Sequence, residues 1–349
     1  MENSILQLFP SGSRALWQNA AREQAAIQEI RLRAGQPIII HRKGKELFLT
    51  DQGELSRNPA EGHLATGREL SETLEHICHY SPYAFEEELR QGFLTVAGGH
   101  RVGVAGQAVL ETDGRVRTFK NISYLNIRVS HQMKGAADGV LPVMYRDGRL
   151  QSALIISPPG CGKTTLLRDL IRQISDGNTY DQGMTVGVVD ERSELAGSFL
   201  GKPQNDMGMR TDVLDGCPKD IGMLLLLRSM SPQVIAIDEL GGDGELKALR
   251  QAAACGCKIL ATVHGEDRQD VEYRFGLGAA FWERLFDVFL VLGKEGGRCV
   301  VKKAETVGKN RRLADHNGTS PEKAEGRLAG LPDWQGGTAW DSGRGHGDD

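Results

Sequence analysis

The chain of 349 residues lacks a long apolar run, a surplus of positive charge and a large aromatic content. Its apolar stretches, such as residues 223–227 and 234–237, fall far short of the about 20 residues that cross a membrane. The first ten residues contain no lysine or arginine, which argues against a secretory signal. We therefore expect a cytoplasmic protein whose contact with any membrane would be peripheral.

A formal net charge of −4 and an aromatic content of 6% give no strong signal for nucleic-acid binding, which needs a basic surface with interleaved aromatic side chains. The six cysteines occur in a long chain without a signal segment, so we expect reduced thiols. Cys255-x-Cys257 has neither a second cysteine pair nor a spaced histidine, and we expect no zinc site there.

The first part of the chain has the pattern of a small α+β domain, which we place at residues 1–135. Residues 27–49 read as strands separated by turns at Ala34-Gly35 and Lys43-Gly44, and further short strands follow in 93–109 and 122–129. From residue 308 onward the chain holds nine glycines and few large apolar side chains. Such a segment cannot offset its ordering entropy by burial, so we expect residues 304–349 to be a disordered, glycine-rich tail.

The part between, residues 136–303, alternates apolar strands with helices. This alternation indicates an α/β domain with a central, mostly parallel sheet covered on both faces. The expected strands are residues 153–156, 185–189, 234–237 and 258–263, and the expected helices are residues 163–174, 220–230 and 244–255.

The strongest motif is a phosphate-binding loop between the first of these strands and the first helix. It reads Ser157-Pro158-Pro159-Gly160-Cys161-Gly162-Lys163-Thr164-Thr165. The two glycines let backbone N–H groups turn toward an anion, and the helix N-terminus adds positive potential. Residues 159–165 are thus expected to bind ATP, with Lys163 on the β- and γ-phosphates and Thr164 on Mg²⁺. Ser157 replaces the usual first glycine, for which we expect a modest geometric cost.

Three further strands end in polar residues, and strand ends on one rim form the site of an α/β sheet. Asp238 is expected to hold the Mg²⁺ together with Thr164, and Glu239 to polarise the attacking water. His264 ends the next strand and should face the γ-phosphate. Glu191 would assist the water or the metal, with the alternative that this acidic run is only a solvated helix start.

Arginines complete the candidate set, because phosphoryl transfer gains from an arginine that is often supplied across a subunit interface. For each one, an ordinary surface or ion-pair role is the open alternative. The candidate contacts are Arg192, Arg210, Arg101 and Arg128.

Together these motifs resemble the type II/type IV secretion ATPase superfamily. The phosphate loop, the acidic run 190–192 and the stretches 226–239 and 260–264 resemble its Walker A, Asp box, Walker B and His box. Residues 29–37 resemble the N-terminal strand of the same ATPases. Within the superfamily the sporulation branch is the most similar, and the resemblance covers about residues 27–303.

The resemblance implies a RecA-like P-loop ATPase domain behind the N-terminal α+β domain. It also implies a ring-shaped homo-oligomer, a hexamer, with the nucleotide between the two domains of one subunit and arginines from a neighbour. For the sporulation branch it implies a motor under integral-membrane channel proteins that join mother cell and forespore. A P-loop motor acting on nucleic acid, and a scaffold that binds ATP with little hydrolysis, are the alternatives.

Overall fold

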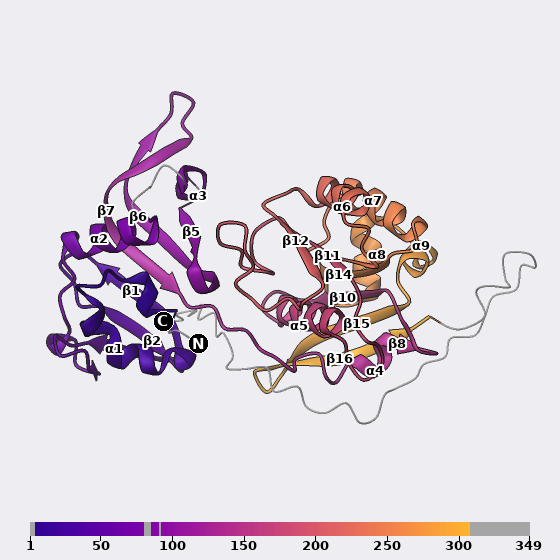
Figure 1. The fold of residues 1–349 in the computed structure, drawn as a ribbon, viewed down its shortest axis with the longest axis horizontal. Helices are drawn as coiled ribbons and strands as arrows, with labels where there is room; N and C mark the ends of the chain where they lie inside the picture. The colour runs from indigo at the N-terminus through magenta and orange to yellow at the C-terminus, as the bar shows by residue number, and fades with distance from the viewer. Residues whose placement is uncertain (1–3, 80–84, 91, 308–349) are drawn as a thin grey trace, which may run out of the picture. The chain divides into compact units, whose positions relative to one another are not determined.

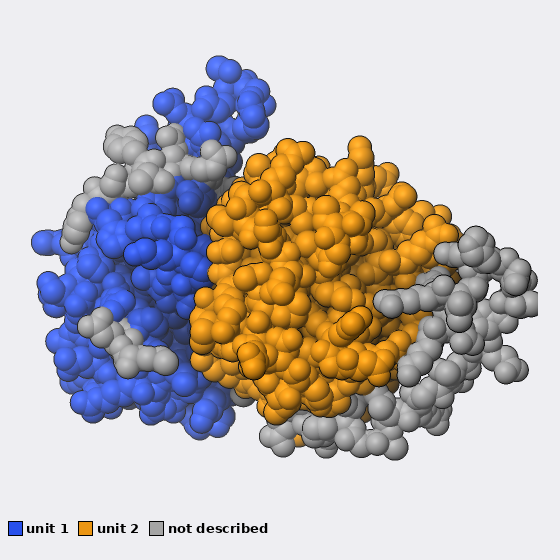
Figure 2. Space-filling view, turned by 45° about the vertical axis from the view of Figure 1, so that its right-hand side comes forward, with its two compact units in different colours: residues 1–131, 197–205 blue, residues 132–196, 206–349 orange. Residues whose placement is uncertain are grey.

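We describe a computed structural model of the chain, covering residues 4–79, 85–90 and 92–307. The chain divides into two compact units (Figures 1 and 2). Unit 1 contains the described residues up to His131 and also Gly197–Asn205, a segment from inside the region assigned above to the second domain. Unit 2 contains Gln132–Ala196 and the described residues from Asp206 onward. Residues 304–306, which we expected to begin the disordered tail, belong to the last strand of unit 2. From residue 308 the expected tail lies outside the described residues.

Unit 1 is built on one antiparallel sheet in the order β4-β3-β2-β1-β7-β6-β5 (Figure 1). Its strands are β1 (Ile27–Arg33), β2 (Ile39–Arg42), β3 (Lys45–Leu49), β4 (Leu55–Ser56), β5 (Phe93–Val96), β6 (His100–Leu110) and β7 (Val116–Arg128). Its helices are α1 (Arg14–Arg22), α2 (Gly67–Ile77) and α3 (Glu86–Arg90). The expected α+β domain is therefore present, with an antiparallel sheet.

Side chains alternate between the two faces of this sheet. One face carries buried residues such as Ile30, Val102 and Ile127, which belong to a core with Trp17 and Phe9. The rings of Phe9 and Trp17 stack with centroids 3.8 Å apart, which fixes α1 against the chain before it. The opposite face carries charged and aromatic side chains together, such as Arg101 and Phe93.

Unit 2 contains a seven-stranded sheet in the order β12-β11-β13-β14-β10-β15-β16, in which only β16 is antiparallel to its neighbour. The strands are β10 (Ala153–Ser157), β11 (Val186–Asp190), β12 (Thr211–Asp215), β13 (Val234–Ile237), β14 (Lys258–His264), β15 (Val288–Glu295) and β16 (Arg298–Thr306). The mostly parallel sheet expected from the sequence is thus confirmed. The antiparallel pair at one edge was not expected.

Helices cover both faces of this sheet. One face packs against α5 (Lys163–Asp176), and the other against α6 (Lys219–Ser229), α7 (Asp243–Ala254), α8 (Arg268–Phe275) and α9 (Ala279–Leu285) (Figure 1). Before the sheet lie α4 (Leu141–Met144), β8 (Tyr145–Arg146) and β9 (Arg149–Leu150). None of the helices in the described ranges has the length and apolar character that crossing a bilayer requires.

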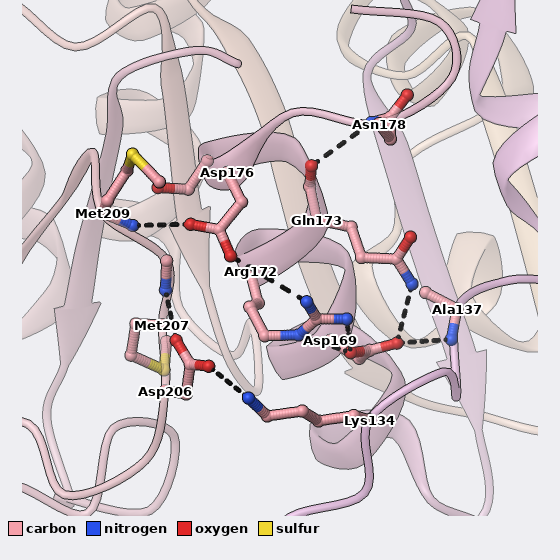
Figure 3. A network of polar contacts seen from close by, with 12 residues as sticks. Lys134, Ala137, Asp169, Arg172, Gln173, Asp176, Asn178, Asp206, Met207 and Met209 are labelled. Atoms are coloured by element: carbon pink, nitrogen blue, oxygen red, sulfur yellow. Dashed lines mark hydrogen bonds and ion pairs between the residues drawn. The ribbon is translucent and has the colours of Figure 1, made fainter. Parts of the chain in front are cut away.

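The fully buried carboxylate of Asp169 fastens the start of unit 2 to α5 (Figure 3). It accepts hydrogen bonds from the backbone N–H of Ala137 at 2.9 Å and from Arg172 and Gln173 at 2.7 and 2.9 Å. A buried carboxylate is costly unless every lone pair finds a donor, and here the donors come from both the helix and the preceding segment. The middle of the helix that follows the phosphate loop is therefore tied to the segment at Ala137.

A buried histidine, His100, opens β6 in unit 1 with only 2% of its surface exposed. Its Nδ1 accepts the backbone N–H of Ser130 at 3.0 Å, and its Nε2 lies 2.8 Å from the hydroxyl of Ser4. Burial, with a smaller effect from His131, lowers the pKa of His100 to about 4. The ring is therefore neutral in the folded protein at neutral pH.

Acid should weaken unit 1 through His100. Because the folded pKa lies below the unfolded value of about 6.5, the stabilisation is complete above pH 6.5 and is lost as the pH falls toward 4. We expect a loss of about 2 kcal/mol between pH 7.5 and 5 from this group. Urea unfolding followed by hydrogen exchange in β6 and β7 measures it. His100→Asn should flatten this slope, and an equal slope in both proteins would contradict the assignment.

Candidate nucleotide-binding site

The phosphate loop joins the end of β10 to the start of α5. Gly160 and Gly162 have φ values of +69° and +82°, a left-handed conformation that suits glycine. Within the described part of the chain, the N–H groups of residues 160–165 have no hydrogen-bond acceptor. Six unpaired donors around a helix N-terminus form a cradle that fits the phosphates of a nucleotide.

The serine at the first position of the motif causes no backbone strain. Ser157 is the last residue of β10 and lies opposite His264 of β14 in parallel register. Its φ is not positive, so the position does not require glycine. Its side chain is fully buried, and its hydroxyl donates to the carbonyl of Pro158 at 2.9 Å.

Asp238, directly after β13, lies between two hydroxyl groups. Its Oδ2 is 2.7 Å from Oγ1 of Thr164 in α5, and its Oδ1 accepts a hydrogen bond from Thr262 in β14. A hydroxyl and a carboxylate on facing elements are a donor set that suits Mg²⁺, which keeps several waters and takes its remaining ligands from phosphate. The pair expected from the sequence to hold the metal is therefore close together.

Glu239, Lys163 and His264 meet beside this pair. Lys163 Nζ is 2.9 Å from Glu239 Oε1 and 3.1 Å from His264 Nε2, and the histidine nitrogen is 3.0 Å from the same carboxylate oxygen. Arg192 reaches the other oxygen of Glu239 at 3.2 Å. Burial raises the pKa of Glu239, but Lys163 and His264 outweigh it and hold this pKa below its ordinary value. Glu239 is therefore a carboxylate at neutral pH.

The backbone of Glu239 is in the left-handed region, with φ at +57°. Such a conformation is costly for a residue other than glycine and persists only where neighbours enforce it. The hydroxyl of Thr262 accepts the N–H of Glu239 at 2.8 Å, and Lys219 Nζ donates to its carbonyl at 2.6 Å. These two side chains fix the direction in which the carboxylate points.

Lys219 and Thr262 are site residues to which the sequence analysis assigns no role, although Thr262 lies within the stretch 260–264. Lys219 is 8% exposed and lies 3.5 and 3.3 Å from the carboxylates of Glu191 and Glu245. It begins α6, and no spacing rule distinguishes it from a surface lysine. Thr262 carried a signal, because a fully buried polar residue inside an apolar strand needs partners.

The acidic residues at the end of β11 have different roles: one supports the following loop, and the other contacts Lys219. Asp190 is buried, and its carboxylate accepts the N–H groups of Glu194, Leu195 and Ala196 at 2.7 to 3.0 Å, which shapes the following loop. Among the contacts of the described residues, Glu191 is linked to the site through Lys219, with which it forms an ion pair. Its expected part in activating water or holding metal stays a prediction.

The other candidate arginines lie elsewhere. Arg210 donates to the carbonyls of Ser175 and Asp176 at 2.7 and 3.2 Å, at the end of α5 away from the phosphate loop. Arg101 and Arg128 face each other across β6 and β7 of unit 1, and Arg101 covers the ring of Phe93 at 3.9 Å. Within unit 2 only Arg192 of the four contacts the clustered side chains, so contacts of the others with a nucleotide stay predictions.

Comparison with known proteins adds relatives of two kinds. The family model described as "Sporulation stage III, protein AA" matches residues 1–308. The stage III sporulation protein AA of Bacillus subtilis (strain 168) is 38% identical over 296 residues, which are 84% of this chain and 92% of that protein.

Among solved structures, the ATPase DotB of Legionella pneumophila has a TM-score of 0.54 at 17% identity, and the match covers 86% of this chain and 82% of that chain. The pilus retraction motor PilT with bound ADP has the same score and identity, with coverages of 82% and 83%. The last two show that the fold is that of RecA-like secretion ATPases.

Lys219 should act as a positioning residue for Glu239. Lys219→Met removes the donor to the Glu239 carbonyl, so we expect the turnover of ATP to fall on the order of 10–100-fold while nucleotide binding changes little. Steady-state kinetics with nucleotide binding measured separately gives this split. Lys247→Met, an exposed lysine on the neighbouring helix α7, is the matched control. A loss of folded protein with unchanged turnover per folded molecule would leave Lys219 a merely structural role.

Proposed function

The chain belongs to the sporulation stage III protein AA family, and from this premise we propose that it is an ATP-hydrolysing motor subunit. The observation that carries the proposal is the meeting of Lys163, Glu239 and His264 within 3.1 Å at the carboxyl ends of the strands. Hydrolysis of a nucleoside triphosphate needs a cation on the phosphates and a base near the water. The phosphate-loop lysine, the carboxylate and the strand-end histidine suit these tasks.

Nucleotide binding begins with the loop. The N–H donors of residues 160–165 and the N-terminus of α5 supply fixed positive potential for the phosphates. Thr164 and Asp238 would hold Mg²⁺, which neutralises charge on the phosphates when bound. Thr164 lies in the first turn of α5 and Asp238 directly follows β13, so regular elements hold both groups.

Lys163 then has two competing partners. Only 7% of its surface is exposed, and its charge is compensated by Glu239. Phosphates in the cradle attract the same ammonium, and its departure leaves Glu239 with His264 and Arg192 only. Glu239 Oε1, which then keeps His264 as its partner, can accept a proton from water that attacks the terminal phosphate. Binding and base activation are thereby coupled through one side chain.

Variants of two residues test the ATPase proposal. Lys163→Ala should abolish ATP binding, and Glu239→Gln should retain binding but lose at least 10²-fold in turnover. Calorimetric binding and phosphate release measure the two effects separately. Glu75→Gln removes an exposed charge from α2 and should change neither. Retained affinity in Lys163→Ala would refute the phosphate-loop assignment, and undiminished hydrolysis in Glu239→Gln would shift the base role to Glu191.

We further propose that the subunits form a ring, a hexamer, that works beneath integral-membrane channel proteins during sporulation. The family membership and the secretion-ATPase fold support this assignment. Arginines such as Arg192, with 68% of its side chain exposed, are then available to a neighbouring subunit's nucleotide. In this setting the substrate of the motor is a membrane assembly.

A trapped motor should identify that assembly. Glu239→Gln, loaded with ATP and used to capture proteins from membranes of the encoding organism, should retain integral-membrane channel subunits. Mass spectrometry of the captured material provides the measurement, with Lys163→Ala as the control that cannot load. Capture of RNA or DNA in their place would favour a motor that acts on nucleic acid.

A further inference from the structure

The hairpin of β15 and β16 extends beyond the strand that carries the phosphate loop. β15 runs parallel to β10, and the pairing ends at Ile156 opposite Val291. The hairpin continues to Glu295 and turns at Gly296-Gly297, whose φ values are +56° and +79°. Since parallel strands end on the same rim, the extension lies beside the loop that follows β10.

Two residues that face each other across this hairpin approach the loop at Gly160. Lys294 pairs with Cys299 in the register of the two strands, so both side chains lie on one face. Cys299 Sγ is 3.8 Å from the Gly160 carbonyl oxygen. A methyl group built on Gly160 would lie 3.9 Å from Lys294 Nζ, and no other described atom beyond its chain neighbours comes within 4 Å of that point. The Lys294 ammonium therefore lies close to Gly160 of the loop, on the side where a side chain at this position would point.

Lys294 differs from the other cations near the loop because it has no carboxylate partner among the described residues. Lys163 and Arg192 both pair with Glu239. Lys294 is exposed and has no carboxylate within ion-pair distance in the described part of the chain. A cation held over a cradle of unpaired N–H donors is poised for an anionic ligand.

We propose that Lys294 is a second cationic contact for the phosphate chain of the nucleotide, supplied by the hairpin. The inference rests on the proposed ATP-binding function and deepens it. Lys163 enters the site from the helix side of the loop, whereas Lys294 comes from the neighbouring edge of the sheet. The phosphates are then bracketed between two elements, and the hairpin joins the binding site as a structural part.

Removal of this charge should weaken nucleotide binding. Lys294→Met should raise the Kd of MgATP and MgADP about tenfold, as expected for the loss of a charge-assisted contact. It should also reduce the dependence of Kd on salt, because one charge pair is gone. Lys294→Arg keeps the charge and should restore most of the affinity. Titration calorimetry at two salt concentrations provides both readings.

Arg298→Met is the matched control, because Arg298 lies opposite Glu295 and so projects from the other face of the same hairpin. This variant also removes one positive charge, and it should bind nucleotide with the affinity of the unchanged protein. Equal weakening by both variants would reduce the effect to general charge and overturn the proposal. Unchanged affinity in Lys294→Met, while Lys163→Ala loses binding, would overturn this inference alone. Binding unaffected in Lys163→Ala as well would refute the proposed function itself.

Discussion

The ion pair between Lys163 and Glu239 is the interaction on which the site depends. The lysine is almost entirely buried, and an uncompensated charge in that position would be strongly destabilising. The protein supplies one compensating carboxylate, and that carboxylate is also the group best placed to act on water. One charge therefore has two possible partners, Glu239 and the phosphates. Under the proposed function, this exchange would make the activity of Glu239 depend on the arrival of the nucleotide.

That arrangement requires Glu239 to be held in an unfavourable backbone conformation. A left-handed φ at a residue other than glycine costs about 1–3 kcal/mol. Hydrogen bonds from Lys219 and to Thr262 offset the cost, one at the carbonyl and one at the N–H. Thr262 also donates to Asp238, so these two adjacent acidic residues share a support. The two adjacent acids cannot be repositioned independently of each other.

Most of the fold of unit 2 could be predicted from the sequence because its strands are buried on both faces. The expected strand 234–237 and the expected helix 163–174 match β13 and the greater part of α5. Neither strand of the hairpin of β15 and β16 was expected, although the apolar start of β15 was a usable signal; β16 is an edge strand of mixed polarity without a clear alternation. Gly296-Gly297 between β-forming residues was the available signal. The return of residues 197–205 to unit 1 follows from contacts distant in sequence, which no local pattern records.

The same distinction holds for the candidate site. Lys163, Thr164, Asp238, Glu239 and His264 could be read from the sequence because chemistry restricts residue type and parallel strands bring their ends to one rim. Lys219 and Lys294 could not, because Lys219 meets the Glu239 carbonyl and Lys294 approaches Gly160 only once the chain is folded. Any lysine or arginine whose Cα lies at a suitable distance could make such a contact, and the packing of the elements sets that distance. The candidate reacting groups can therefore be identified from the sequence, whereas the residues that position them can be identified only from the structure.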